Sequence, residues 1–172
     1  MRIGIIRARW HADIGNSLLA GVKESLSECG VLEENIIESE VPGSFELPLA
    51  ARYLALSGTV DAIVPIGVLI KGDTLHFEVI AESTTKALMD VGLSTGVPVM
   101  MGVLTVNTEE QATARSTGSN NHGLQWGKAA VEMALLRASA IGRKGRKFFL
   151  GFGTEEDKAE KEKQAGAGKI GF

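Results

Sequence analysis

The chain has a single cysteine, no long apolar run and no excess of basic residues. A lone Cys29 excludes an intramolecular disulfide and a metal site built from several cysteines, and it fits a reducing compartment. No apolar run approaches the roughly 20 residues that span a bilayer, and the opening segment MRIGIIRARW lacks the apolar stretch of a secretory signal. We therefore expect a cytoplasmic protein that is not embedded in a membrane.

Charge and short motifs narrow the classes further. With 18 Lys and Arg against 21 Asp and Glu, the net charge is -3, so we expect no nucleic-acid partner. The zinc motif HExxH, the dinucleotide motif GxGxxG, the P-loop and the hydrolase motif GxSxG do not occur. What is present is a chain of 172 residues, 44% of them hydrophobic, which is enough for one globular domain with a substantial core.

Apolar segments alternate with segments of helical spacing. Runs dense in branched apolar residues, typical of buried parallel strands, occur at 3–6, 36–41, 60–69 and 97–104. Helices are predicted at 13–29, 45–56, 74–93 and 123–140. Gly30 is suited to end the first helix, because it can adopt a positive φ. The alternation predicts a three-layer α/β/α domain with a four-stranded parallel sheet.

The end of the chain differs in composition. A basic segment (142–147), an apolar one (148–153) and a mixed-charge one (154–164) precede a Gly- and Ala-rich end. We expect residues 1–141 to form the α/β domain. Residues 142–172 are expected to be a C-terminal extension, partly disordered or docked on the surface.

Unusual residues follow each predicted strand, at the sheet edge where ligands collect in parallel α/β proteins. The four segments are RARWHAD, VPGSFELP, KGDTLH and TVNTEEQATARSTGSNNHG. In KGDTLH, Asp73 and Thr74 open a predicted helix whose free amides can hold a phosphate, although both residue types are also ordinary helix caps. Arg115 is a candidate partner for such a phosphate.

Several other residues have both a functional and a structural interpretation. His76 can transfer protons near neutral pH or simply hydrogen-bond a carbonyl. Trp10 is either a lid on the core or a platform for a planar heterocycle. Ser44 and Glu46 can bind hydroxyl groups or cap a helix. We interpret Trp126 as packing.

Five longer segments carry a resemblance. They are VPGSFELP, GVLIKGDTLHFEVI, GVPVMMGVLTV, EEQATAR and NNHGLQWGKAAVEM. In this order and approximate spacing they resemble lumazine synthase, fungal type, from Arg2 to about Ala138. The resemblance implies a flavodoxin-like fold and a homopentamer with active sites between adjacent subunits; some relatives pack such rings into shells.

The implied activity is that of a transferase in riboflavin biosynthesis. It condenses 5-amino-6-(D-ribitylamino)uracil with 3,4-dihydroxy-2-butanone 4-phosphate to 6,7-dimethyl-8-ribityllumazine, releasing phosphate and water. The resemblance implies no cofactor and no metal. The alternatives are a non-catalytic oligomer that binds a flavin or lumazine, and a shell protein.

The resemblance also implies roles for individual residues. Trp10 would stack on the pyrimidine, and His76 would transfer protons beside the leaving phosphate. The other contacts within one subunit would be Ser44, Phe45 and Glu46 to the ribityl chain, the backbone of Val68, Leu69 and Ile70 to the ring, and Asp73 and Thr74 to the phosphate. The neighbouring subunit would supply Met101 to the ring pocket, Arg115 to the phosphate and His122 at the rim.

The chain departs from the family pattern at a few of these positions. His11 stands where most relatives have Asn, Met101 replaces a common Phe, and Gln125 stands where an acidic residue is frequent. The segment from Arg115 to Gly123 is slightly shorter than in fungal relatives. We expect these changes to alter ring and rim contacts while leaving the phosphate site and His76 in place.

Overall fold

Four parallel strands form the central layer of the structure, a computed structural model in which residues 1–141 are described; the predicted extension 142–172 lies outside the described residues. The strands are β1 (Ile3–Ala8), β2 (Ile36–Val41), β3 (Ala62–Ile70) and β4 (Val103–Val106). Their order in the sheet is β2-β1-β3-β4, and all three pairings are parallel. This is the order of a flavodoxin-like sheet, and it confirms the predicted fold class.

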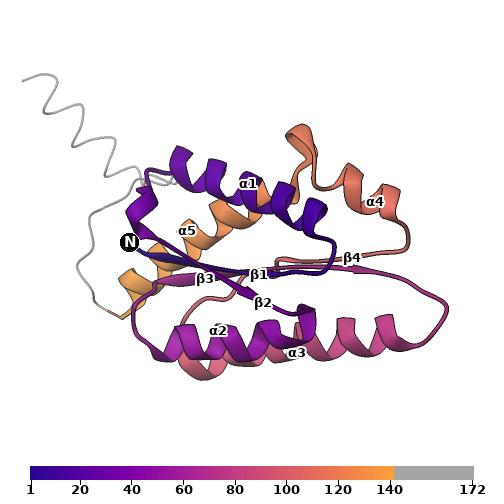
Figure 1. Ribbon diagram of the computed structural model, residues 1–172. Helices are drawn as coiled ribbons and strands as arrows, with labels where there is room; N and C mark the ends of the chain where they lie inside the picture. Colours follow the sequence, from indigo (N-terminus) through magenta and orange to yellow (C-terminus); the bar gives the residue numbers. More distant parts are fainter. Residues whose placement is uncertain (142–172) are drawn as a thin grey trace, which may run out of the picture.

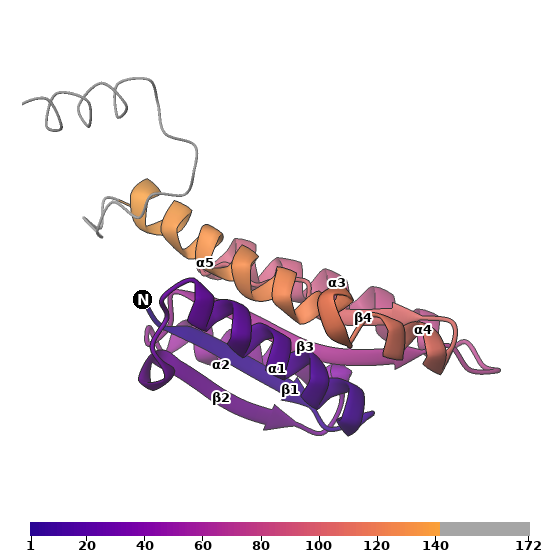
Figure 2. The ribbon, with the colours of Figure 1, turned by 90° about the horizontal axis from the view of Figure 1, so that it is seen from above.

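Helices cover both faces of the sheet (Figure 1). One layer contains α1 (Ala12–Glu28), α4 (Glu109–Ala114) and α5 (His122–Ala140). The other contains α2 (Leu47–Leu56) and α3 (His76–Thr95). Figure 2 shows α1 and α5 side by side above the strands. Three short 3-10 helices complete the elements: η1 (Glu33–Asn35), η2 (Ser44–Glu46) and η3 (Gly118–Asn120).

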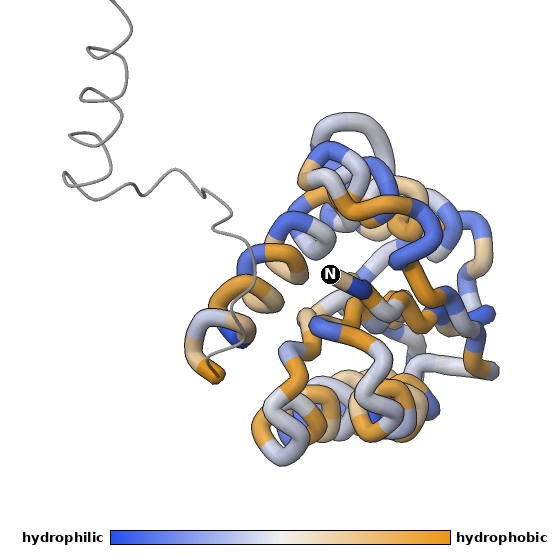
Figure 3. Tube along the Cα trace, turned by 90° about the vertical axis from the view of Figure 1, so that its left-hand side faces the viewer, coloured by the Kyte–Doolittle hydropathy of each residue, from blue (hydrophilic) through white to orange (hydrophobic). Residues whose placement is uncertain are grey.

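The two faces of the sheet each bury a hydrophobic cluster. On one side, Leu18 and Leu26 of α1 belong to a cluster with Ile5 of β1. On the other, Leu47 of α2 belongs to a cluster with Ile6 of the same strand. Neighbouring residues of a strand point to opposite faces, so Ile5 and Ile6 supply both cores. Figure 3 shows the apolar residues along the strands between the helical layers.

Several local predictions are confirmed. Gly30 has φ 80°, as expected for the residue that ends the first helix. Trp126 is partly buried and packs against the core, as predicted; Cys29 packs there too.

Among residues 1–141, no helix is long and apolar enough to cross a membrane.

The start of α3 was predicted two residues too early. The helix begins at His76, because the Thr74 hydroxyl accepts a hydrogen bond from the His76 amide (3.3 Å) and holds Thr74 in the preceding turn. The helix also continues past the predicted end at 93, to Thr95, where Gly96 with φ 66° terminates it.

The predicted strand at 97–104 was also misplaced. Only Val103–Val106 pairs continuously with β3, while Val99 makes an isolated bridge to Ile63. Pro98 has no amide hydrogen to donate to a ladder, which interrupts pairing before the strand. Val97 is nonetheless 3% exposed, so its apolar character reflects core packing rather than strand formation.

Candidate active site

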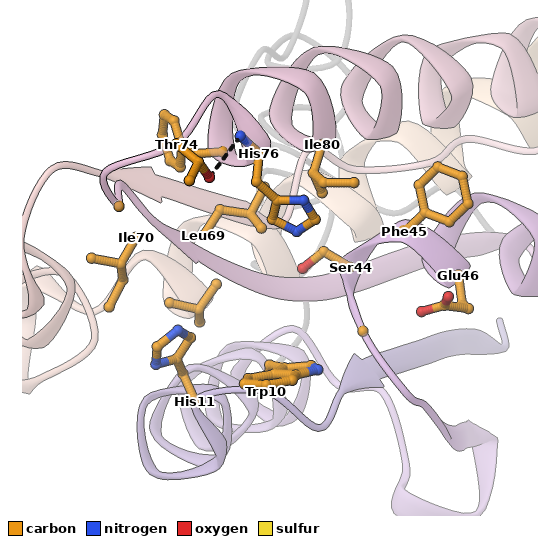
Figure 4. A pocket seen from close by; sticks show the side chains of 14 residues that line it. Trp10, His11, Ser44, Phe45, Glu46, Leu69, Ile70, Thr74, His76 and Ile80 are labelled. Atoms are coloured by element: carbon orange, nitrogen blue, oxygen red, sulfur yellow. Dashed lines mark hydrogen bonds between the residues drawn. The ribbon is translucent and has the colours of Figure 1, made fainter.

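A cavity of about 570 Å³ lies at the carboxyl ends of β1, β2 and β3. Its walls come from four segments that are distant in the sequence. They are residues 10–11 after β1, 43–46 after β2, the end of β3 at 68–70, and the turn and first part of α3 between 72 and 80. Figure 4 shows side chains from these segments around one opening. Such an opening is expected at the carboxyl edge of a parallel sheet, where the connections that follow β1 and β3 lead to opposite faces.

Trp10 and His11 form the turn between β1 and α1. The Trp10 side chain is 71% exposed and lines the cavity, so it is not a lid on the core. His11 has φ 54° and ψ 52°, the only non-glycine residue of positive φ within residues 1–141. Its imidazole makes no capping hydrogen bond to α1 and also lines the cavity. This strained turn places both rings beside the same space, as strained residues at functional sites often do.

The segment after β2 contributes a buried hydroxyl. Ser44 is 5% exposed, and its Oγ has no hydrogen-bond partner among the described residues. Figure 4 shows this Oγ pointing into the cavity, on the side where His76 lies. A buried hydroxyl without a partner is unfavourable, so a ligand hydroxyl would gain from binding there. Beside it, Phe45 is 61% exposed and Glu46 is partly buried.

Strand β3 presents an open backbone edge to the cavity. Its pairing with β1 ends at Ile66, whereas its pairing with β4 continues to Ile70. The amides of Gly67 and Lys71 donate to β4-side carbonyls, at 3.1 and 2.9 Å. Because successive residues of a strand direct their backbone groups to opposite sides, those of Val68 and Ile70 face away from β4. They are therefore available to a ligand with polar atoms along one edge.

Thr74 lies in the turn that leads into α3, and His76 is the first residue of that helix. Both line the cavity, and Figure 4 shows the His76 imidazole projecting into it. Lys71 and Glu78 clamp this turn through a contact of 2.7 Å between Nζ and Oε1. The hydrogen bond from Lys71 holds the pKa of the Glu78 carboxyl below its ordinary value. Asp73, also a predicted phosphate contact, lies in the turn but does not line the cavity.

Besides Asp73, three predicted site residues lie outside this cavity. They are Met101, Arg115 and His122, which were assigned to the neighbouring subunit's site. Met101 is 45% exposed before β4, and Arg115 ends α4 with its Nη1 donating to the Gln111 carbonyl (3.0 Å). The His122 ring meets Trp126 edge to face, with centroids 6.2 Å apart. One chain therefore brings together only the contacts predicted for a single subunit.

Comparison with known proteins indicates which family the chain belongs to. The family model described as 6,7-dimethyl-8-ribityllumazine synthase matches residues 1–138. The chain belongs to the lumazine synthase family. The prediction from the sequence is thus confirmed.

Individual family members give the same result. The 6,7-dimethyl-8-ribityllumazine synthase of Schizosaccharomyces pombe is 49% identical, with 78% of this chain and 87% of that protein covered. The enzyme of the same name from Pyricularia oryzae is 44% identical, covering 80% and 88%. That of Flavobacterium psychrophilum is 40% identical, covering 81% and 74%. Both fungal and bacterial lumazine synthases are therefore similar along most of their length.

Some residues that line the cavity in this lumazine synthase family member were not predicted as contacts. They are His11, which was noted only as a departure, and Gly43, Gly72, Phe77 and Ile80. Ile80 follows His76 by four residues and therefore lies on the same face of α3, a spacing that could have identified it. Gly43 lets the backbone lie close to two site side chains, because a Cβ there would be 3.2 Å from Glu46 Oε2 and 3.4 Å from Trp10 Cδ1.

Proposed function

We propose that this protein condenses 5-amino-6-(D-ribitylamino)uracil with 3,4-dihydroxy-2-butanone 4-phosphate to form 6,7-dimethyl-8-ribityllumazine. Family membership along residues 1–138 supports the reaction. The observation that carries the proposal is the single cavity that holds an exposed indole, a free strand edge, an unpaired hydroxyl and an imidazole. The indole and the strand edge suit a planar ring, the hydroxyl suits a polyol chain, and the imidazole suits proton transfer.

The pyrimidine would bind between Trp10 and the open edge of β3. The exposed indole offers a face for stacking, and the backbone groups of Val68 and Ile70 offer hydrogen bonds to the ring's amide-like edge. Leu69, between them, lines the same wall. Stacking on the indole would favour any planar ring, whereas hydrogen bonds to the strand edge would fix the orientation of the pyrimidine.

The ribityl chain would lie along the segment after β2. Ser44 Oγ lacks a partner and would pair with one ribityl hydroxyl, which removes the penalty of its burial. The Glu46 carboxylate would accept from another hydroxyl, and the exposed Phe45 ring would cover the chain. This assignment uses all three residues that the sequence singled out in this segment.

The phosphate would bind at the turn before α3. The amides of Asp73 and Thr74, the Thr74 hydroxyl and the amino end of α3 favour an anion there. The Asp73 side chain is itself anionic, so its contribution would come from its backbone. Arg115 of an adjacent subunit would neutralise the phosphate, with His122 at the rim and Met101 closing the ring pocket.

His76 would move the protons. The amino group of the pyrimidine attacks the ketone of the butanone and forms a Schiff base with loss of water, and phosphate leaves in an elimination. The ribitylamino nitrogen then attacks the remaining carbonyl carbon, and the second ring closes with loss of a second water. Each step adds or removes protons and leaving groups without a net oxidation or reduction. An imidazole that projects into the cavity beside the phosphate turn can accept and return these protons.

A homopentamer with sites between subunits would complete the cavity. Exposed apolar side chains on α2 and α3 support an interface on that side of the molecule; the largest are Leu49, Tyr53, Leu56, Met89 and Leu93. We further propose that residues 1–141 form one catalytic domain. The single cysteine supports a reducing, cytoplasmic location.

The direct test mixes the two substrates with purified protein and follows lumazine absorbance and phosphate release. The proposal expects both signals in equal amounts, and inorganic phosphate should compete with the butanone phosphate. A non-catalytic flavin-binding protein or shell would give neither signal. Phosphate release without lumazine would also contradict the proposed condensation.

A further inference from the structure

Residues Arg115 to His122, here called the 115–122 loop, close on themselves beside α1. The His122 amide donates to the Arg115 carbonyl (2.9 Å), so the two ends of the loop are neighbours. Those ends are the two residues assigned above to an adjacent subunit's site, Arg115 to the phosphate and His122 at the rim. Anything that fixes this loop on the fold therefore fixes both of them together.

Asn121 is the buried side chain that attaches the loop to α1. It is 8% exposed, and its Nδ2 donates to the Ser17 carbonyl at 2.8 Å. Its Oδ1 accepts from the Gly123 amide, also at 2.8 Å, and so caps α5. The Ser17 hydroxyl in turn donates to the carbonyl of Ser116, at the other end of the loop. One position of α1 thus contacts both ends of the loop.

Gly21 of α1 makes room for this contact. A Cβ added at Gly21 would lie 2.7 Å from the amide group of Asn121, closer than side chains approach one another. A larger residue at position 21 would therefore push Asn121 away from α1. The clearance serves both atoms of the amide, because Nδ2, which donates to Ser17, and Oδ1, which caps α5, would each lie 2.7 Å from that Cβ.

We propose that Asn121 is a positioning residue for phosphate recognition: the hydrogen bond from its Nδ2 to the Ser17 carbonyl holds Arg115 and His122 where an adjacent subunit's substrate binds. The proposal rests on the function proposed above for Arg115. Asn121 itself touches no substrate in this scheme. Its effect is transmitted through the backbone of the loop.

The test compares Asn121→Asp with Asn120→Asp. Aspartate at 121 keeps the oxygen that caps α5 but removes the donor to Ser17, whereas Asn120 is exposed and donates to the Ala114 carbonyl (2.6 Å). Both variants add one negative charge to the same loop, so the second controls for charge. Steady-state kinetics would be measured separately for each substrate, with thermal unfolding recorded for every variant.

The expected result is specific to one substrate. Asn121→Asp should raise KM for the butanone phosphate by about tenfold more than Asn120→Asp, which is within the roughly 100-fold that a 1 Å misplacement can cost. KM for the pyrimidine should stay at the wild-type value. Asn121→Ser, which retains a capping oxygen but is too short to reach Ser17, should behave similarly without adding charge.

Gly21→Ala keeps the inference testable if changes at 121 prevent folding. It leaves the loop chemically intact and favours helix formation, yet its Cβ displaces Asn121. It should therefore raise the same KM in a protein that still unfolds cooperatively.

Two results would overturn the inference. The first is an equal KM for Asn121→Asp and Asn120→Asp, and the second is a lower unfolding temperature in Asn121→Asp with both KM values unchanged, which would leave Asn121 as a cap only. Failure of the function proposed above is distinguishable, because Arg115→Ala would then leave KM for the butanone phosphate unchanged.

Discussion

Replacing Trp10 by alanine should weaken binding of the pyrimidine far more than binding of the butanone phosphate. The indole lies in the cavity with 71% of its surface exposed, and it belongs to neither hydrophobic core cluster. Removing it therefore takes away a ligand contact rather than a structural one. The free energy of unfolding should change by no more than about 0.5 kcal/mol, as for other exposed positions.

The size of the effect follows from the exposed area. A tryptophan can bury up to about 250 Å², so an indole with 71% exposure offers about 175 Å² to a ligand. A ring stacked on one face covers about half of that area, which at about 25 cal/mol per Å² corresponds to about 2 kcal/mol. Stacks of bases on aromatic side chains are worth about 1 to 3 kcal/mol, in agreement with this value. The expected loss is therefore about 30-fold in affinity.

The assay would measure KM for each substrate at saturating levels of the other, together with direct titration of the lumazine product. Trp10→Phe is the matched control, because it keeps an aromatic face of smaller area and should lose only part of the affinity. Equal losses for both substrates would refute the proposed division between ring and phosphate sites. An unchanged affinity for the product in Trp10→Ala would refute stacking altogether.

Three further predictions concern the turn before α3 and the residue that would complete it. His76→Ala should reduce kcat by about 100- to 10,000-fold yet leave measurable synthesis, since positioning can supply about 7 to 11 kcal/mol; wild-type turnover at neutral pH would remove its role. Arg115→Ala should raise KM for the butanone phosphate by about 10- to 150-fold, the value of a charged hydrogen bond, with kcat less affected; a larger change in the pyrimidine KM would contradict the assignment. Lys71→Ala should raise the pKa of Glu78 toward its ordinary value, because the hydrogen bond from Lys71 is the main cause of its lowering. The titration of the Glu78 carboxyl would be followed by NMR, and an unchanged pKa in the variant would exclude that pairing.

The sequence predicted β1 and β3, whose residues are mostly buried, and it also placed the edge strand β2 correctly. The expected strand at 36–41 matches β2, although Glu38 and Glu40 are exposed there. The prediction failed before β4, because Val97 and Val99 pack as core residues without belonging to a strand. An apolar run in the sequence indicates that a segment is buried. Burial alone does not distinguish a strand from an irregular segment that crosses the core.

The candidate site was predictable in its residues but not in its backbone. Motif spacing identified Trp10, Ser44 and His76, and the structure places all three around one cavity. The left-handed conformation of His11 could not be predicted, because it depends on how the turn after β1 meets α1. Nor could the surroundings of Ser44 Oγ, which has no hydrogen-bond partner among the described residues and lies so close to Gly67 that a Cβ there would be 2.6 Å from that oxygen. The contact of Ser44 with Gly67 joins segments distant in sequence, whereas the conformation of His11 depends on the path of the chain from β1 into α1.

Helix α1 connects two features that the proposed mechanism assigns to different cavities. Its amino end follows Trp10 and His11, which line the chain's own cavity, and Ser17 contacts the 115–122 loop, which would serve an adjacent subunit. At a rise of about 1.5 Å per residue, less than two helical turns separate these contacts, so a rigid displacement of α1 moves both. Residues of one chain form both core clusters, so we expect a subunit separated from the proposed oligomer to retain its fold. It would then carry parts of two sites and a complete version of neither, which is why activity should depend on assembly even where stability does not.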